Sequence, residues 1–365
     1  MKHKILIGIP PTRHVILGLD ELSGLEGLGY VCHQIPYSRN KWNISLLNRM
    51  YGVILNAFKV LIELYKQKPD ILYLNSRLDV NGSLRDAFSI LVFRYLYFLP
   101  LKIVIKSHGS DLSILKKKSF IFKKFAIPVL MSKVDAWLFL SKDEVEGLLK
   151  YKPELKNKVF VTYNIINPKR SVYSESFQKK YNLPKNKFKF LYVGRMVYEK
   201  GVFAILDGIA KFSKKEDCVF LMVGNGEELE NLKSKAVELG VSENIIFTGF
   251  IEEVECDHFY ANSDALIFPS LDEGFAMALF KSVVAGLPII TTQIRAAKDQ
   301  LIAPDNCLWV DGKSGDSVAA ALAELYENKA LRNSMRYNNV KLGEKFNRTN
   351  VSEDMHTVFQ KIYQH

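Results

Sequence analysis

The chain has 365 residues, of which 48% are hydrophobic, so it is long enough for two packed cores, and two domains are expected. Its positive charge is confined to one half: residues 1–165 contain 25 Lys and Arg against 13 Asp and Glu, a balance of +12, whereas residues 166–365 contain 25 against 26, a balance of −1. The first half is therefore expected to face an anionic partner. Since no zinc-finger spacing, RNP pattern or basic recognition helix is present, we predict an anionic membrane surface or a phosphate-bearing acceptor and no nucleic acid.

The cysteines and the apolar segments indicate a cytoplasmic protein. The four cysteines contain no Cys-x-x-Cys pair, which argues against a zinc site or a disulfide framework and suits a reducing cytosol. The start, Met1–Gly8, has too short an apolar part for a signal peptide. The most apolar long segment, 87–105, contains Arg94, Pro100 and Lys102 and falls short of the about 20 apolar residues of a membrane span. Membrane contact is therefore expected to be peripheral.

Strand-like runs and helical patterns alternate along the first half. The predicted strands are 5–9, 71–74, 103–105, 136–140 and 159–161, and the predicted helices include 20–29, 48–66 and 115–132. The aromatic residues Tyr95, Tyr97 and Phe98 are expected in the core rather than as a platform for sugar stacking. Such alternation predicts a parallel, doubly wound sheet.

The pattern restarts after a polar stretch at 164–184, which we interpret as a linker. The second half has predicted strands at 188–193, 218–223, 245–248, 265–268 and 288–291, and predicted helices at 201–213, 227–239 and 275–286. We predict two Rossmann-like domains, 1–167 and 168–349, with a last helix in 350–365 that returns to the first domain. Two such domains would place a ligand cleft between the carboxyl edges of their sheets.

Two loops of the second half carry residues suited to a phosphorylated ligand. Gly194, Arg195 and Lys200 follow the strand 188–193, and a diphosphate needs a fork-shaped donor, a point cation and free backbone N–H groups of this kind. The alternative is that both cations are solvated loop charges. After the strand 265–268, the turn at Glu273 leads into a helix, an arrangement in which α/β enzymes present a helix N-terminus to an anion.

Taken in order, these motifs resemble glycosyltransferase family 4. The resemblance covers about 188–312 and rests on Gly194-Arg195, Lys200-Gly201, Val223-Gly224-Asn225-Gly226, Thr248-Gly249-Phe250, Pro269-Ser270, Glu273-Gly274-Phe275 and Ala285-Gly286 with Pro288. In the first half only His108-Gly109-Ser110-Asp111 and Phe139-Leu140-Ser141 match. The glycine-rich loop that the family has after its first strand is absent here, where the chain reads Ile9-Pro10-Pro11-Thr12-Arg13-His14.

The resemblance implies an α/β GT-B fold, with two facing Rossmann-like domains and a cleft between them. It implies retaining transfer of a sugar from a nucleotide-diphosphate donor held by the second domain to an acceptor held by the first, without a metal or other cofactor. The implied catalytic residues are His108, Arg195, Lys200 and Glu273. The implied donor-binding residues are Gly194, Arg195, Lys200, Asn225, Ile251, Asp272, Glu273, Gly274, Phe275, Ala276 and Lys281.

The implied roles differ among these residues. Glu273 would bind the sugar hydroxyls, the backbone N–H groups of 274–276 would meet the diphosphate, and Ile251 would lie near the nucleobase. His108 would lie near the sugar and the acceptor; the alternative is a structural histidine that caps the following turn.

Lys281 departs from the family pattern, which has a ribose-binding Glu at this position. An ammonium cannot accept hydrogen bonds from a ribose diol as a carboxylate does. Three readings stay open: Lys281 contacts a phosphate instead, nucleotide affinity is weak without a partner, or catalysis has been lost and the protein is a scaffold. Because Arg195, Lys200 and Glu273 are all retained, we favour an active enzyme.

The acceptor is predicted to contact Thr12, Arg13, His14 and Asp111. The lysine-rich and aromatic segment 115–125 could lie on anionic lipid or be a core helix with a lysine-rich face. We predict a glycosyltransferase that builds a bacterial cell-surface glycan, such as lipopolysaccharide or capsule, on a lipid-linked or phosphorylated acceptor at the inner face of the plasma membrane. The alternatives are a non-catalytic nucleotide-sugar-binding subunit of a glycosyltransferase complex and a nucleotide-sugar epimerase.

Overall fold

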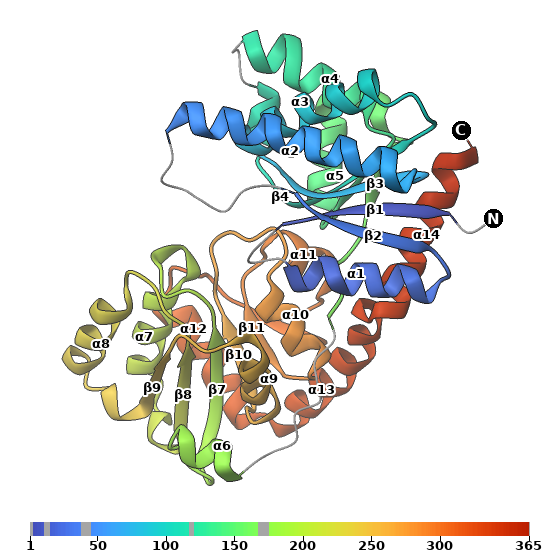
Figure 1. The fold of residues 1–365 in the computed structure, drawn as a ribbon. Coiled ribbons are helices and arrows are strands. Elements are labelled where there is room, and N and C mark those ends of the chain that lie inside the picture. The colour runs from blue at the N-terminus through green and yellow to red at the C-terminus, as the bar shows by residue number, and fades with distance from the viewer. Residues whose placement is uncertain (1–2, 11–14, 38–44, 117–119, 167–174, 365) are drawn as a thin grey trace. The chain divides into compact units, whose positions relative to one another are not determined.

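The chain folds into two compact α/β units (Figure 1). The computed structural model describes residues 3–10, 15–37, 45–116, 120–166 and 175–364. Unit 1 contains residues 1–165 and 348–365, and unit 2 contains residues 166–347. The assignment of the acceptor to the first and the donor to the second stays a prediction.

Unit 1 is built on a parallel sheet of six strands in the order β2-β1-β3-β4-β5-β6. The strands are β1 (Lys4–Ile9), β2 (Val31–Pro36), β3 (Ile71–Leu78), β4 (Lys102–Ser110), β5 (Ala136–Phe139) and β6 (Val159–Val161). The inner strands read as nearly continuous apolar runs because helices bury the sheet on both faces. The β2 strand is missing from the sequence prediction.

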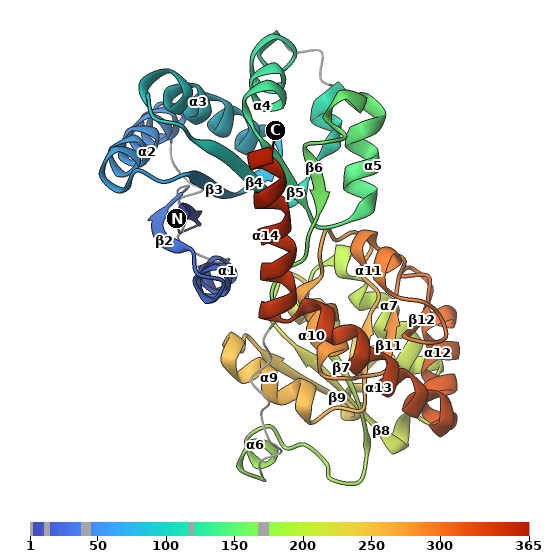
Figure 2. The same cartoon turned by 90° about the vertical axis from the view of Figure 1, so that its right-hand side faces the viewer.

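Helices cover both faces of this sheet. They are α1 (Val15–Gly27), α2 (Leu46–Gln67), α3 (Val80–Leu96), α4 (Ile127–Lys133), α5 (Lys142–Tyr151) and the returning helix α14 (Arg348–Gln364). On one face, α2, α3 and α4 pack together around Leu64, Phe93 and Leu130. On the other, α14 lies against α1 (Figure 2), and an ion pair of 2.7 Å between Arg348 and Asp20 joins the two helices.

The segment predicted as one helix at 115–132 is broken into several pieces. A 3₁₀ turn covers Leu112–Lys116, a π-helical turn covers Ile121–Ala126, and α4 follows. Pro128 lies in the first turn of α4 and has no N–H to donate to the carbonyl four residues earlier. The turn before it accordingly uses the wider spacing, in which Ile127 N–H donates to the carbonyl of Phe122.

Unit 2 is a second parallel sheet of six strands, in the order β12-β11-β10-β7-β8-β9. The strands are β7 (Phe188–Val193), β8 (Cys218–Val223), β9 (Ile245–Gly249), β10 (Ala265–Phe268), β11 (Ile289–Thr291) and β12 (Cys307–Trp309). Numbered within the unit this is the order 3-2-1-4-5-6 of dinucleotide-binding folds, read from the β9 edge.

The helices of unit 2 flank this sheet. They are α6 (Glu175–Lys180), α7 (Val202–Lys211), α8 (Leu229–Glu238), α9 (Glu253–Ala261), α10 (Met277–Val284), α11 (Arg295–Gln300), α12 (Gly315–Glu327) and α13 (Lys329–Gly343). The helix α6 lies inside the stretch predicted as a linker. The sequence prediction omits α9, α11, α12, α13 and β12. No helix within the described ranges is long and apolar enough to cross a bilayer.

Candidate active site

The loops that carry the predicted donor residues leave one edge of the sheet in unit 2. In a parallel sheet the carboxyl ends of all strands meet at the same edge, and here β7, β8, β9 and β10 end at Val193, Val223, Gly249 and Phe268. The strand order reverses between β7 and β10, and ligands of open α/β sheets bind at such a switch point. The structure brings to this edge Gly194, Arg195, Lys200, Asn225, Ile251, Asp272, Glu273, Gly274, Phe275 and Ala276.

Glycines let the loops at this edge approach one another closely. Gly201 has φ 68°, and a Cβ there would lie 2.1 Å from the carbonyl oxygen of Pro269. Gly224 has φ 133°, and a Cβ there would lie 1.9 Å from the carbonyl oxygen of Gly194. Any other residue would push the loops after β7, β8 and β10 apart. The predicted glycine positions therefore set the spacing of the site.

Lys200 and Glu273 form an ion pair across the loops after β7 and β10. A backbone hydrogen bond of 2.8 Å from Leu271 to Glu199 fixes the same two loops to each other. The Lys200 side chain is 10% exposed and the Glu273 side chain 26%, so the pair is partly accessible. An ammonium has three donors and a carboxylate two acceptor oxygens, so both groups keep hydrogen-bonding capacity for a ligand.

The helix α10 begins directly after this pair. Its N-cap residue, Ala276, provides no side-chain hydrogen bond, and the first bond within the helix runs from Phe280 N–H to Ala276 C=O (3.1 Å). The first turn of α10 carries the positive end of the helix dipole. Phe275 is buried and stacks on Phe280 at 4.3 Å, so only the backbone of this predicted donor residue faces the turn.

Arg195 lies on the same edge with an exposed side chain. The hydroxyl of Tyr192 donates to the Arg195 carbonyl at 2.8 Å and holds the loop. Burial of this hydroxyl, together with the nearby Glu273 carboxylate, raises the pKa of Tyr192 well above its usual value, so it stays a neutral donor. Because the Arg195 side chain is exposed and Tyr192 contacts only its carbonyl, the guanidinium can meet an anion at the sheet edge.

The other three predicted donor residues of these loops are Asp272, Asn225 and Ile251. The Asp272 carboxylate accepts from Arg295 of α11, with both oxygens at 3.1 Å from one guanidinium nitrogen. Asn225 is exposed, and its side-chain oxygen accepts from Gly226 N–H at 2.8 Å. Ile251 is half-buried before α9. Asp272 and Asn225 thus have structural partners as well as a place at the edge.

Lys281 is engaged by α9 and not by the turn at Glu273. Its ammonium contacts the carboxylates of Glu253 at 2.9 Å and Asp257 at 3.4 Å, and its side chain is 14% exposed. Burial opposes the charged form, but the hydrogen bond to Glu253 and the two carboxylates outweigh it and raise the pKa of Lys281. The ammonium is therefore a link between α9 and α10.

His108 in unit 1 belongs to a buried polar network on one face of the sheet. Lys106 and His108 are two residues apart on β4, so their side chains lie on the same face of the sheet, and Asn75 on β3 is in register with Lys106. The fully buried Lys106 donates to Glu21 of α1 at 2.5 Å and to the carbonyl of Tyr163 at 2.7 Å. The sequence prediction missed this network, although Lys106, a lysine directly after the apolar run 103–105 of a predicted strand, is a signal for a buried ion pair.

The network determines which nitrogen of His108 carries a proton. The Glu21 carboxylate only accepts, so the Asn75 amide nitrogen faces it at 3.1 Å and the Asn75 amide oxygen faces His108. An amide oxygen also only accepts, so the His108 Nε2 at 2.6 Å must be the donor. In the neutral imidazole, Nδ1 is then the acceptor nitrogen. His108 is thus oriented by Asn75, Glu21 and Lys106.

The remaining predicted acceptor residues are placed as follows. Asp111 is exposed, and its side chain accepts from Ser113 N–H at 3.0 Å, so it caps the 3₁₀ turn after β4. Thr12, Arg13 and His14 lie outside the described residues. Within the described ranges, no group of three His, Cys, Asp or Glu side chains is arranged to hold a metal ion.

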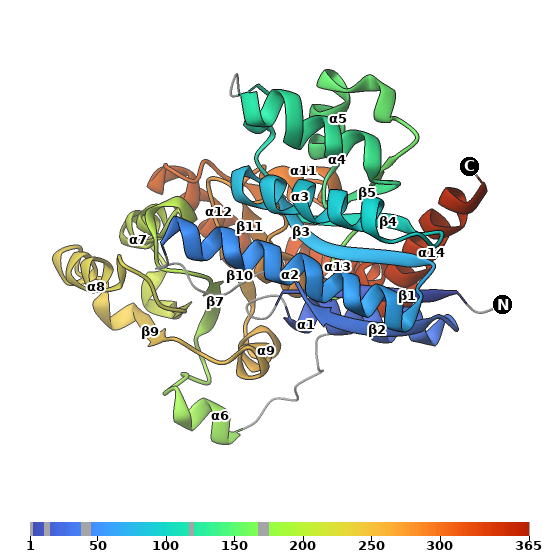
Figure 3. The same cartoon turned by 45° about the horizontal axis from the view of Figure 1, so that its top comes forward.

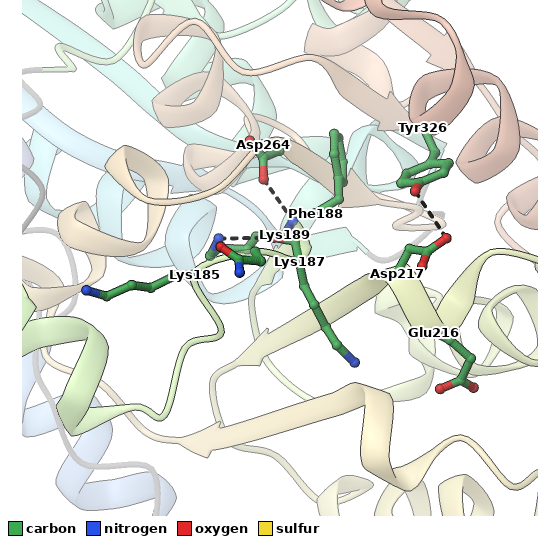
Figure 4. Close-up of a pocket in the computed structure, with 9 residues that line it drawn as sticks. Lys185, Lys187, Phe188, Lys189, Glu216, Asp217, Asp264 and Tyr326 are labelled. Atoms are coloured by element: carbon green, nitrogen blue, oxygen red, sulfur yellow. Dashed lines mark hydrogen bonds between the residues drawn. The ribbon is translucent and has the colours of Figure 1, made fainter.

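A cavity of about 690 Å³ in unit 2 has a different lining, which includes Phe188, Asp217 and Tyr326 (Figure 4). It is at the opposite edge of the sheet, where β7 begins at Phe188 and Asp264 precedes β10. Its polar groups bond one another: Asp264 accepts from Lys189 N–H at 2.9 Å, and Tyr326 donates to Asp217 at 3.2 Å. We therefore place the candidate site at the carboxyl edge, where the cations and the α10 N-terminus gather.

Comparisons with known proteins indicate the family to which the chain is similar. Residues 174–342 match the family described as Glycosyl transferases group 1. An uncharacterized glycosyltransferase of Methanocaldococcus jannaschii is 24% identical over 95% of the chain and 89% of its own length. The capsular polysaccharide biosynthesis glycosyltransferase CapM of Staphylococcus aureus is 23% identical over 90% of the chain and 84% of its own length.

Among solved structures, Anabaena HepE in complex with UDP and glucose superposes with a TM-score of 0.74, at 13% identity, over 98% of the chain and 99% of HepE. This likeness confirms the predicted α/β class and the two six-stranded Rossmann-like sheets as the GT-B fold. The predicted cleft between the units concerns their relative placement and stays a prediction.

Proposed function

We propose, from the match of residues 174–342 to the group 1 glycosyltransferases, that the chain transfers a sugar from a nucleotide-diphosphate donor to a glycan or lipid-linked acceptor with retention of anomeric configuration. The observation that carries the donor part is the partly accessible Lys200–Glu273 pair at the switch point, directly before the uncapped N-terminus of α10. This arrangement provides a cation and the positive end of a helix dipole for a diphosphate, and a carboxylate for a sugar hydroxyl.

The cations would act on the leaving group. When the bond between the anomeric carbon and the donor phosphate oxygen breaks, negative charge develops on the diphosphate, and Lys200, Arg195 and the first turn of α10 would stabilise it. Because these groups can meet that charge without a metal, we propose that neither a metal nor another cofactor is needed. HepE has the same fold and was solved in complex with UDP and glucose, which supports a nucleotide sugar as the donor class.

Retention follows from transfer on a single face of the sugar. The acceptor hydroxyl would enter on the side of the leaving group, form its bond to the anomeric carbon, and pass its proton to a diphosphate oxygen. His108, with Nε2–H held by Asn75, would lie near the sugar and the acceptor. No covalent nucleophile is required in this scheme.

For the acceptor we propose a glycan or a lipid-linked, phosphorylated precursor of a cell-surface polysaccharide or lipopolysaccharide. The relation to CapM, named for capsular polysaccharide biosynthesis, and the +12 balance of residues 1–165 support this class. Such an acceptor would place the enzyme on the inner face of the plasma membrane. The proposal leaves Thr12, Arg13, His14 and Asp111 as acceptor contacts to be tested.

Two measurements on one set of mixtures test the proposal. Purified protein is combined with UDP-, GDP- and ADP-sugars, with and without a membrane lipid extract, and both thermal stability and release of nucleoside diphosphate are recorded. One donor is expected to raise the melting temperature, because a ligand of the native state stabilises it. The same donor should release its nucleoside diphosphate only when the extract is present.

The other outcomes separate the alternatives. Stabilisation by a donor without any turnover would support a non-catalytic subunit and contradict the enzymatic proposal. A new donor isomer formed without the extract would indicate an epimerase. The variant Glu273→Gln, which keeps the size of the side chain, is the matched control and should bind the nucleotide sugar without releasing its nucleoside diphosphate.

A further inference from the structure

The helix α2 carries an apolar stripe that is exposed, in addition to the apolar face that packs into unit 1. The exposed stripe recurs at spacings of three and four residues, so its members share one side of the helix. It consists of Leu47, Met50, Tyr51, Ile54, Phe58, Ile62 and Tyr65. Leu47 is 77% exposed and Ile62 is 64% exposed, whereas Ala57, Val60 and Leu64 on the other side are buried.

The stripe continues into the segment between α3 and β4. The Tyr65 hydroxyl donates to the Leu96 carbonyl at 2.6 Å, and the Tyr65 ring packs edge-on against Tyr97 at 5.0 Å. Of the three aromatics expected in the core, Tyr97 is buried but Tyr95 and Phe98 are exposed, Phe98 by 82%. Figure 3 shows α2 running beside α3 on the outside of unit 1. The stripe and the exposed residues of 95–99, here called the α2 surface, form one apolar region.

Basic side chains border the α2 surface. By the period of 3.6 residues, the positions next to the stripe and away from the core include the exposed Lys59 and Lys66. Residues 1–165 carry a balance of +12. A large apolar patch on a soluble protein marks an interaction site, and an apolar stripe with a lysine border is the pattern of a helix that lies in a membrane interface.

We propose that the α2 surface is the site at which this chain docks on a bilayer containing anionic lipids, with α2 parallel to the membrane plane. Leu47 to Tyr65 would enter the boundary between headgroups and acyl chains, and Lys59 and Lys66 would meet lipid phosphates. A second copy of the chain fits this surface less well, because it would bring a second strongly basic unit against the first. The proposal rests on exposure and charge and does not require the proposed transferase activity.

The position differs from the one that the sequence favours. For the segment 115–125 the sequence leaves two possibilities, contact with anionic lipid or a core helix with a lysine-rich face, and residues 117–119 lie outside the described residues. Phe122 is buried as expected, but Phe120 and Ile121 are exposed. The longest continuous apolar stripe in the described part of unit 1 is on α2, so we assign the docking surface there.

Sedimentation with lipid vesicles tests the proposal on the full chain. The wild-type protein is expected to bind vesicles of equal parts phosphatidylglycerol and phosphatidylcholine, and to bind vesicles of pure phosphatidylcholine more weakly. High salt should weaken binding to the vesicles that contain phosphatidylglycerol. The variant with Tyr51→Ser, Phe58→Ser and Ile62→Ser should lower the partition coefficient by about tenfold or more, since three apolar contacts with the bilayer are lost.

A matched control removes three comparably exposed apolar side chains from unit 2, by Val237→Ser, Ile302→Ser and Tyr337→Ser, and should bind like the wild type. Phe58→Trp gives a second readout that tolerates any loss of stability in the serine variant: its emission should shift to the blue with anionic vesicles, and that of Tyr337→Trp should not. Equal vesicle binding by the two serine variants, or no binding by the wild type, would overturn the proposal. So would a stable dimer in solution that only the α2 variant dissociates.

Discussion

Each unit contains an ion pair between a lysine and a glutamate. The pair in unit 1 lies beside the candidate site residue His108, the pair in unit 2 consists of candidate site residues, and the two pairs differ in burial. In unit 1, Lys106 and Glu21 are both fully buried, and their other partners are the carbonyl of Tyr163 and buried side chains such as Asn75. In unit 2, Lys200 and Glu273 are joined across two loops at the sheet edge and stay partly accessible. The sequence alone does not distinguish the two pairs, because a lysine or glutamate has the same charge whether it is buried or partly exposed.

The difference separates support from ligand binding. A buried pair is desolvated once, on folding, and can only orient its neighbours, so Lys106 and Glu21 fix the direction of Asn75 and thereby of His108. A pair at a sheet edge retains free donors and acceptors and can exchange its partner for a ligand. The account therefore expects changes in unit 1 to alter stability first and changes at the pair of unit 2 to alter activity first.

The largest expected effect is on activity at the pair of unit 2. Lys200→Met should lower kcat/KM by about 10²- to 10³-fold, since one cation that stabilises the leaving diphosphate is removed. Its melting temperature should fall less than that of Lys106→Met, because the Glu273 side chain left without its cation is 26% exposed. Steady-state kinetics with the donor found by screening gives the measurement, and Lys211→Met, an exposed lysine on α7, is the control. A loss of activity matched by a loss of folding would contradict the assignment.

The next effect is on stability at the pair of unit 1. Lys106→Met should lower the free energy of unfolding by about 3–5 kcal/mol, because it leaves the Glu21 carboxylate buried without its cation. Adding Glu21→Gln should recover part of that loss, since the uncompensated charge is gone. Denaturant unfolding of the single and double variants measures the change. If the double variant is no more stable than the single one, burial of an unpaired charge is not the cause.

A smaller effect is expected at the link between these two residues and His108. Asn75→Ala should remove the hydrogen bond that selects the Nε2–H form of His108, so kcat/KM should fall by about tenfold. Nitrogen NMR of the histidine ring reports the tautomer directly: the wild type should show Nε2–H, and the variant a mixture. A variant that loses stability but keeps a pure Nε2–H signal would assign Asn75 a structural role alone.

The smallest effect is expected at Lys281. Lys281→Met should leave the affinity for nucleoside diphosphate nearly unchanged, because the ammonium already contacts Glu253 and Asp257, and should lower the melting temperature slightly. The raised pKa of Lys281 means that the stabilisation is present at neutral pH and is lost as the pH rises above about 10.5. The difference in melting temperature between wild type and variant should therefore be constant from about pH 6 to pH 9 and shrink above that value. A difference that disappears near neutral pH would contradict the ion pairs.

The sequence predicts the fold and the loops at the carboxyl edge of unit 2, for a physical reason. Buried strands of parallel sheets are continuous apolar runs, and the glycines at 201 and 224 mark places where backbones must touch, so both are legible without a structure. The turn at Glu273 and the loop at Lys200 could be located for the same reason, although nothing in the sequence said that their side chains pair.

Other features depend on contacts between distant segments, and these were missed. The partners of Lys281 lie on α9, a helix that the sequence prediction omits, and the partner of Lys106 lies 85 residues away on α1. The exposure of Tyr95 and Phe98 could not be read from their apolar character, because an aromatic run has the same composition whether it faces a core or a surface.

The measurement that tests the central claim most directly is the affinity of Lys200→Met and Lys281→Met for the nucleoside diphosphate selected by the donor screen, determined by titration calorimetry. If the carboxyl edge of unit 2 at Lys200 and Glu273 holds the diphosphate, Lys200→Met should weaken binding by about tenfold or more, and Lys281→Met should bind like the wild type. Undiminished binding by Lys200→Met, or a greater loss in Lys281→Met, would contradict the account.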